Sequence, residues 1–182
     1  MPLFPCARII VFDRTKTILV STERGNFSFP KGKLKIAKGK SKRNKNKNKE
    51  FFDGDKNETE VDGAWRELGE ETGLTKEHVK LIEEVPIDEL SDKGHPSVRY
   101  FVGVLVKPHD KITFDKDELA AVGWHDVEEA LQLEKFKNAR KMVLEQAWNK
   151  YKSTISQISE EIGRIKNPLM NTKILPVDYL FP

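Results

Sequence analysis

The chain has 182 residues, of which 37% are hydrophobic and 34% charged, and its net charge is +3. This length suits one domain with an extension, and the low hydrophobic content indicates that part of the chain lies outside the core. The single cysteine, Cys6, excludes an intramolecular disulfide, and no apolar run approaches the roughly 18 residues of a membrane span. We therefore expect an intracellular protein, cytoplasmic or nuclear, without a membrane partner.

The first part of the chain predicts a hairpin followed by a long interruption. Residues 7–12 and 17–21 are short runs rich in β-branched side chains, separated by turn-forming residues 13–16. Residues 27–34 read as an extended segment that ends in a Pro/Gly loop. Residues 35–57 consist largely of Lys, Asn and Gly, and such a segment cannot bury enough apolar surface to fold alone. We predict a flexible basic insertion over these residues.

A helix with three glutamates on one side is predicted next. Thr59 stands at the first position of a capping box, and Gly73 is placed to end the helix. Glu67, Glu70 and Glu71 fall at i, i+3 and i+4, so in a helix they share an arc roughly 100° wide. Carboxylates this close repel one another, and a hard divalent cation such as Mg²⁺ or Mn²⁺ would neutralise them.

The same acids also fit an ordinary solvated helix face. Arg66 stands four residues before Glu70, which is the spacing of an ion pair on a helix surface. The spacing alone leaves both interpretations open.

The rest of the chain predicts strands and then helices. In chain order we expect strands over 79–85, 98–106 and 121–124, a helix over 127–133, and an amphipathic helix from 136 to 151 that continues to about 165. Strands on both sides of an acidic helix, with helices at the end, predict a mixed β-sheet covered by helices on both faces.

The residues around the acidic helix resemble the signature of the Nudix hydrolases. That signature reads Gly, five residues, Glu, seven residues, then Arg-Glu-aliphatic-x-Glu-Glu-x-Gly-aliphatic. Here Glu58, seven further residues and the run from Arg66 to Leu74 match throughout. Phe52 stands where the opening glycine belongs, and Gly32, in a Pro-Lys-Gly loop, looks like that glycine displaced by the insertion. The signature is therefore interrupted, and its two halves are both present.

The resemblance implies an α/β/α sandwich with a mixed β-sheet over residues 1–150, with residues 151–182 as a C-terminal helical extension and tail. It also implies an enzyme that uses Mg²⁺ or Mn²⁺ to cleave phosphoanhydride bonds in nucleoside diphosphates linked to another group. The implied metal ligands are Glu67, Glu70 and Glu71, with the Gly32 carbonyl and Glu58 as weaker candidates. Arg66 would orient the glutamates through charge-assisted hydrogen bonds.

Other residues have an implied role and an ordinary alternative. Glu118 resembles the loop glutamate that acts as base or extra ligand in several Nudix branches, but it also belongs to a plain acidic loop. Lys31 and Lys33 flank Gly32, where they would bind phosphate as point charges or be exposed loop lysines. Tyr100 would stack on a base or pack in the core.

Residues 121–137 resemble a segment of asymmetric diadenosine tetraphosphate hydrolases and, more loosely, of diphosphoinositol polyphosphate phosphohydrolases. The implied substrate is a dinucleoside polyphosphate or a diphosphoinositol phosphate. One alternative is mRNA decapping or another RNA 5′-end pyrophosphohydrolase, with RNA held by the basic insertion, although this segment lacks interleaved aromatics. A second is a non-catalytic binding module, against which the three retained glutamates argue.

Overall fold

The computed structural model describes residues 4–37, 51–52, 58–82, 86–109 and 111–166. Most of the predicted basic insertion and the whole tail after Lys166 lie outside these ranges. The chain divides into two compact units, Met1–Tyr151 and Lys152–Pro182. None of the helices in the described ranges combines the length and apolar character that a membrane crossing needs.

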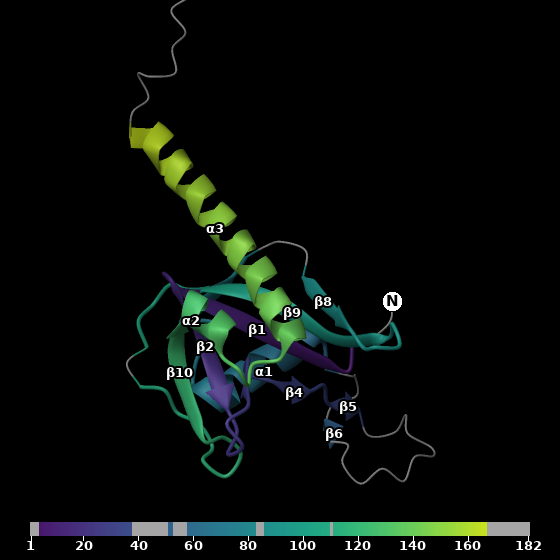
Figure 1. Cartoon of the computed structure of the whole chain (residues 1–182). Coiled ribbons are helices and arrows are strands. Elements are labelled where there is room, and N and C mark those ends of the chain that lie inside the picture. Colours follow the sequence, from purple (N-terminus) through teal and green to yellow (C-terminus); the bar gives the residue numbers. More distant parts are fainter. Residues whose placement is uncertain (1–3, 38–50, 53–57, 83–85, 110, 167–182) are drawn as a thin grey trace, which may run out of the picture. The chain divides into compact units, whose positions relative to one another are not determined.

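The first unit is built on a mixed β-sheet (Figure 1). Its strands among the described residues are β1 (Cys6–Asp13), β2 (Lys16–Ser21), β3 (Phe27–Ser28), β4 (Gly32–Lys33), β7 (Val79–Leu81), β8 (Ile87–Leu90), β9 (Pro96–Leu105) and β10 (Ala121–Asp126). The main path runs β10-β2-β1-β9-β7, with β3 beside β2, β4 beside β1 and β8 beside β9. The β1–β9 pair is parallel and the other pairs are antiparallel, so the predicted mixed sheet is confirmed.

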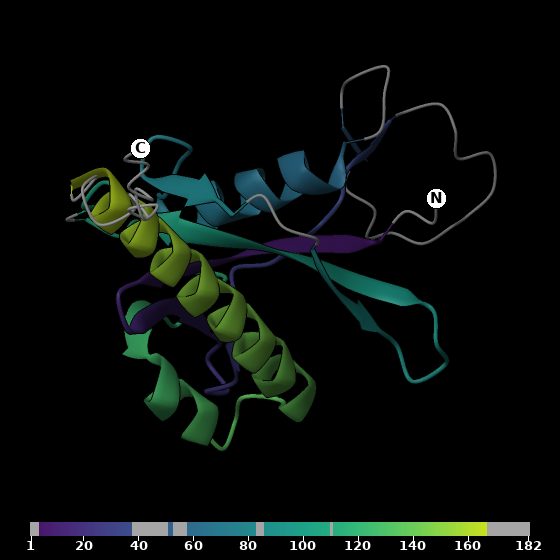
Figure 2. The same cartoon turned by 90° about the horizontal axis from the view of Figure 1, so that it is seen from above.

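Helices cover both faces of this sheet, as Figure 2 shows for β1 and β9. The described helices are α1 (Glu60–Thr72), α2 (Val127–Gln132) and α3 (Asn138–Lys166). Side chains alternate along β1: Ala7, Ile9 and Val11 join the core under α1, and Ile10 and Phe12 join the core under α2 and the first part of α3. This burial of a central strand on both faces produces the predicted three-layer sandwich.

Helix α1 begins and ends where its sequence predicts. The Thr59 hydroxyl accepts a hydrogen bond from the Asp62 N–H at 3.2 Å, which supplies the N-cap. Gly73 has φ 76°, in the left-handed region that glycine adopts freely, and its N–H donates to the Gly69 carbonyl. Glu58 therefore lies just outside the helix, as expected.

The sequence predicted neither β8 of the main sheet nor the short strands β5 (Ile36–Ala37) and β6 (Phe51–Phe52), which pair within the range predicted as a flexible insertion. Residues 87–90 form β8, an edge strand that pairs with β9. Its short, acidic sequence carries little strand signal, but two long-range contacts hold it. The Asp88 carboxylate accepts two hydrogen bonds from Arg99, each 2.8 Å long, and Glu89 accepts one from Tyr100. Tertiary partners thus supply the stability that local propensity does not.

In the second unit the described residues continue α3 from Lys152 to Lys166. Ile155 and Ile158 are exposed on this part of the helix. The predicted C-terminal helical extension is therefore present through Lys166.

Candidate active site

The acidic side of α1 meets the loop that contains Gly32. Ala64 and Leu68 pack into the core, which fixes the rotation of the helix about its axis. Glu67 and Glu71 are each only 8% exposed, whereas the side chain of Glu70 is 56% exposed. The three predicted ligands therefore line one side of α1, with two of them buried and the third in solvent.

Gly32 lies directly against the carboxylate of Glu67. A Cβ atom at position 32 would stand 1.6 Å from both Cδ and Oε1 of Glu67, far inside van der Waals contact. Strand β4 holds Gly32 there by pairing it with Ala7 of β1. Only glycine allows this approach of backbone and carboxylate, which gives the displaced glycine of the signature a physical reason.

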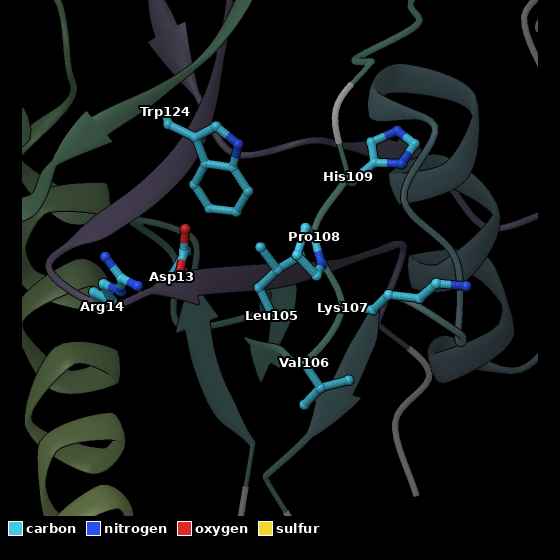
Figure 3. A pocket seen from close by; sticks show the side chains of 8 residues that line it. All are labelled: Asp13, Arg14, Leu105, Val106, Lys107, Pro108, His109 and Trp124. Carbon is cyan, nitrogen blue, oxygen red and sulfur yellow. The ribbon is translucent and has the colours of Figure 1, made fainter.

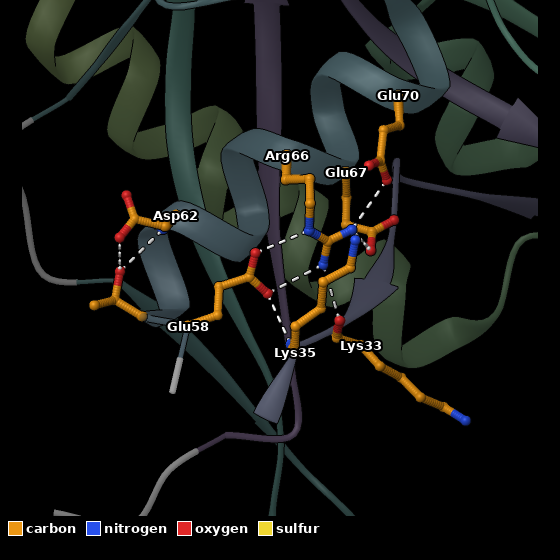
Figure 4. A network of polar contacts seen from close by, with 8 residues as sticks. Lys33, Lys35, Glu58, Asp62, Arg66, Glu67 and Glu70 are labelled. Carbon is orange, nitrogen blue, oxygen red and sulfur yellow. Dashed lines mark hydrogen bonds and ion pairs between the residues drawn. The ribbon is translucent and has the colours of Figure 1, made fainter. Parts of the chain in front are cut away.

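The Arg66 guanidinium donates hydrogen bonds to three of the carboxylates (Figure 4). Its Nε and Nη2 donate to the two oxygens of Glu58 at 2.8 and 3.1 Å, and its Nη1 donates to Glu67 at 2.5 Å and to Glu70 at 3.0 Å. Nη2 also donates to the Lys33 carbonyl at 3.0 Å. Burial favours a neutral guanidinium, but the hydrogen bonds from Arg66 to Glu58 and Glu67 outweigh it and raise the pKa of Arg66. The predicted orienting role of Arg66 thus has a geometric basis.

Glu58 is held at the base of the insertion. The Lys35 N–H donates to the Glu58 carboxylate at 2.8 Å, and the Glu58 N–H donates to the Lys35 carbonyl at 3.0 Å. Between Lys35 and Glu58 in the sequence, the strand β5 (Ile36–Ala37) pairs in parallel with the strand β6 (Phe51–Phe52). Burial raises the pKa of Glu58. The hydrogen bonds from Arg66 and Lys35 lower this pKa by more than burial raises it, so the net shift is downward. The two halves of the interrupted signature therefore meet.

Glu71 is the most perturbed acid of the site. Its pKa is raised to about 7, chiefly by burial and in addition by the negative charges of Glu67 and Glu118. The hydrogen bond from the Lys31 N–H, which is 2.7 Å long, lowers this pKa and so offsets part of the rise. Glu118 itself is exposed, in the loop before β10. The predicted base candidate therefore lies within electrostatic reach of the buried carboxylates.

The chemistry of these residues fits a hard divalent cation. Among the described residues, no three acidic, histidine or cysteine side chains are grouped as metal binding would require. Arg66 instead holds Glu67 and Glu70. Buried carboxylate oxygens are nevertheless the donors that Mg²⁺ and Mn²⁺ prefer. Burial, and after it the charges of Glu67 and Glu118, disfavour the ionised form of Glu71 and raise its pKa, and a bound cation would stabilise that ionised form.

Of the two alternatives for Tyr100, the structure agrees with packing in the core. Its side chain is fully buried, edge-on to Phe29, and its hydroxyl donates to Glu89. A buried ring has no free face for a nucleotide base, so Tyr100 belongs to the core. The side chains of Lys31 and Lys33 are exposed, as phosphate binding requires, while their backbones contact Glu71 and Arg66.

Two contributors to the site are missing from the sequence interpretation. The Lys35 N–H binds Glu58, but a backbone donor carries no residue-type signal. At Gly63 a Cβ would stand 2.3 Å from Cδ2 of Leu34, so glycine lets α1 pass close over this loop residue. In the sequence, the signal for this close approach is the presence of a glycine, Gly63, inside an otherwise regular helix.

These features define the class of the protein: a three-layer α/β/α domain with a carboxylate site where an acidic helix meets a glycine loop. The profile of the NUDIX domain matches residues 2–146, and the chain belongs to this family. It is a Nudix hydrolase, an enzyme of the class that acts on nucleoside diphosphate derivatives and generally uses divalent metals such as Mg²⁺ or Mn²⁺.

Solved structures agree with this fold. An Ap4A hydrolase from C. elegans in a binary complex is 18% identical, with a TM-score of 0.57 over 84% of this chain and 98% of its own. A NUDIX family hydrolase from Clostridium perfringens is 13% identical, with a TM-score of 0.57 over 82% and 98%. A MutT NUDIX hydrolase from Burkholderia pseudomallei is 17% identical, with a TM-score of 0.52 over 80% and 98%. A comparison with curated proteins gave no match.

Proposed function

We propose that this enzyme is a Mg²⁺- or Mn²⁺-dependent hydrolase of dinucleoside polyphosphates such as diadenosine tetraphosphate. The observation that carries the reaction type is the packing of the Glu67 carboxylate against Gly32, beside the buried Glu71. The substrate choice is supported by the resemblance of residues 121–137 to asymmetric diadenosine tetraphosphate hydrolases. The name of the C. elegans Ap4A hydrolase, which shares the fold, points the same way.

In this proposal Glu67, Glu70 and Glu71 hold the metal. When bound, the cation screens the phosphate charges and polarises the attacked linkage. Glu58 is assigned a positioning role in place of the metal role, because both of its oxygens are engaged by Arg66 and Lys35. The Gly32 carbonyl stays a candidate ligand.

Other residues of the chain handle the water and the substrate. Glu118 accepts the proton of the attacking water, since it is exposed and near Glu71. Lys31 and Lys33 bind the polyphosphate from the rim of the site as point charges. Arg66 keeps the glutamates at fixed positions relative to the substrate, which lowers the entropic cost of reaching the transition state.

A product analysis tests the substrate assignment. Purified enzyme with Mg²⁺ or Mn²⁺ is given diadenosine tetraphosphate, a diphosphoinositol phosphate, a nucleotide sugar and capped RNA. We expect asymmetric cleavage of diadenosine tetraphosphate to a nucleoside monophosphate and triphosphate, with the highest kcat/KM of the panel. Preference for the diphosphoinositol phosphate would move the assignment to that substrate, and cleavage of capped RNA alone would overturn the small-molecule proposal.

RNA 5′-end hydrolysis is the second candidate function. The basic insertion leaves the domain at Lys35 and returns at Glu58, and these two residues are hydrogen-bonded to each other beside Arg66. Phosphate contacts by its lysines would give salt-dependent affinity for RNA. Loss of capped-RNA cleavage on deletion of residues 40–49, with unchanged cleavage of diadenosine tetraphosphate, would assign this role to the insertion.

A further inference from the structure

A cavity of about 460 Å³ lies away from the carboxylates, at the other end of β1. Ala7, the partner of Gly32, stands near the start of β1, and Asp13, which lines the cavity, ends it. Six residues of strand separate these positions by about 20 Å. The cavity is of the size of small-ligand sites, which span roughly 300–1,000 Å³. It is therefore a site distinct from the proposed catalytic centre.

The walls of this cavity combine an aromatic ring with charged groups (Figure 3). The indole of Trp124, from β10, points into the space between Asp13 and Pro108. Arg14 adds a positive charge and Asp13 a negative charge, while the Lys107 side chain extends away from Arg14 and its ammonium pairs with Glu77 at 3.9 Å. An aromatic face together with the guanidinium of Arg14 suits a planar ring that carries an anionic group.

Arg14 occupies a position that favours glycine. It follows Asp13 in a two-residue turn between β1 and β2, and its φ is 53°. Among the described residues, Arg14 is the one non-glycine residue with positive φ. A turn with positive φ at its first central position normally takes glycine there, because any side chain is strained. The chain thus keeps a long cation at the cavity against the local preference of its backbone, a pattern typical of binding sites.

The opposite wall of the cavity is held in place by a fixed pair of histidines. The Thr75 N–H donates to Nδ1 of His78 at 3.2 Å. Nε2 of His78 lies 3.3 Å from Nδ1 of His109, within hydrogen-bond distance, and the two rings pack edge to face with centroids 4.5 Å apart. The Val106 N–H also donates to the His78 carbonyl, at 2.8 Å. The loop that carries Lys107 and His109 is thus tied to the turn after α1, and the cavity is preformed.

We propose that this cavity is a second nucleotide site, which binds a purine nucleoside monophosphate. The base stacks on Trp124, the phosphate accepts hydrogen bonds from the Arg14 guanidinium, and Asp13 accepts hydrogen bonds from the sugar hydroxyls. A nucleoside monophosphate is also a product of the proposed reaction, and this reading of the ligand as a product rests on the proposed function. The binding itself does not depend on catalysis.

Calorimetry with adenosine monophosphate in EDTA tests this site, because removal of metal prevents phosphate from binding through a cation at the carboxylates. We expect the full chain to bind one equivalent, and adenosine and inorganic phosphate to bind at least tenfold more weakly. Arg14→Gly should weaken the binding of adenosine monophosphate at least tenfold. Its melting temperature should equal or exceed that of the wild type, because glycine relieves the turn. Lys93→Gly removes one charge from a distant exposed turn and should change nothing.

Equal affinity of the wild type and Arg14→Gly would overturn the proposal, as would the absence of any binding at millimolar ligand. Phosphate that binds as tightly as adenosine monophosphate would show a simple anion site and exclude a role for Trp124. Trp124→Phe, which keeps a ring, should retain binding within threefold. Arg14→Gly should hydrolyse diadenosine tetraphosphate at the wild-type rate in Mg²⁺. An inactive wild type that still binds in EDTA would contradict the proposed function and leave this site standing.

Discussion

At the scale of single residues, Arg66 determines how the carboxylates stand. Its guanidinium binds Glu58, Glu67, Glu70 and the Lys33 carbonyl at once, which a lysine cannot do because it lacks the planar fork of donors. The sequence predicted the pairing of Arg66 with Glu70 from their spacing. The bond to Glu58 was not predictable in that way, because it depends on how the insertion closes.

Gly32 offers a direct test of the site's geometry. In Gly32→Ala the new Cβ would displace the Glu67 carboxylate, so we expect kcat to fall at least 100-fold, as misplacement by about 1 Å commonly causes. Steady-state hydrolysis of diadenosine tetraphosphate measures this loss. The matched control is Gly69→Ala on α1, where the nearest atom stands 3.6 Å from the new Cβ. This variant should keep its activity and gain about 0.5–1 kcal/mol in the free energy of unfolding. Wild-type kcat in Gly32→Ala would contradict the described packing.

Glu71 predicts a pH dependence of stability in the metal-free protein. Its folded-state pKa of about 7 lies above the ordinary value of 4.5, so its contribution is fully present below about pH 4.5 and is lost as the pH rises through 7. Glu71→Gln should therefore be more stable than the wild type at pH 8 in EDTA, by up to about 3 kcal/mol. Urea unfolding at pH 5 and pH 8 measures the difference. Parallel pH profiles of the two proteins would refute this origin of the shift.

At the scale of elements, the insertion is joined to the domain through a closed base. The reciprocal hydrogen bonds between Lys35 and Glu58, together with the β5–β6 pair, bring its ends together. The sequence located the insertion by composition and identified Gly32 and Glu58 as the two sides of the interruption. It could not show that they meet, because closure is made by backbone groups across a long separation.

A neutral insertion of the same length tests this closure. Replacement of residues 38–50 by a Gly/Ser linker of about 13 residues should leave the melting temperature within a few degrees of the wild type, because the parallel strands β5 and β6 keep a connection of the length that they need. Cleavage of diadenosine tetraphosphate should also stay within about threefold, since Lys35 and Glu58 keep their contacts. Thermal unfolding and kinetics measure both. A collapse of activity with intact folding would instead give the insertion a part in catalysis.

The sequence predicted strands and helices correctly where the residues of the element itself carry the pattern that defines it. The hairpin of β1 and β2, the caps of α1 and the Asp126 N-cap of α2 are all local features. Strand β8 and the burial of Tyr100 depend on contacts with other elements, so the sequence missed β8 and left two alternatives open for Tyr100. A tyrosine on a strand has the same local pattern whether it faces a ligand or the core.

At the scale of the whole molecule, the two units differ in whether their residues belong to the core of the hydrolase fold. The core of the first unit includes residues of α3 as far as Tyr151, whose ring stacks on Phe12 with centroids 4.9 Å apart. The residues from Lys152 onward form a unit of their own. We therefore expect the hydrolase fold to need the first part of α3 only.

Truncation tests this division. A chain that ends at residue 155 should fold and hydrolyse diadenosine tetraphosphate at near the wild-type rate. A chain that ends at residue 142 loses Leu144, Ala147 and Tyr151 from the core and should not fold, since each large apolar truncation costs about 2–5 kcal/mol. Circular dichroism and kinetics distinguish the two. Loss of folding at both lengths would place the second unit within the domain.

Thermal unfolding with and without Mg²⁺ or Mn²⁺ tests most directly whether Glu67, Glu70 and Glu71 bind a divalent cation. Glu70→Gln is the sharpest variant, because a substitution at this exposed side chain leaves the core intact. We predict that metal raises the melting temperature of the wild type and that this rise is lost in Glu70→Gln and Glu71→Gln. A wild-type melting temperature that does not respond to either cation, or an equal response in the variants, would contradict the account.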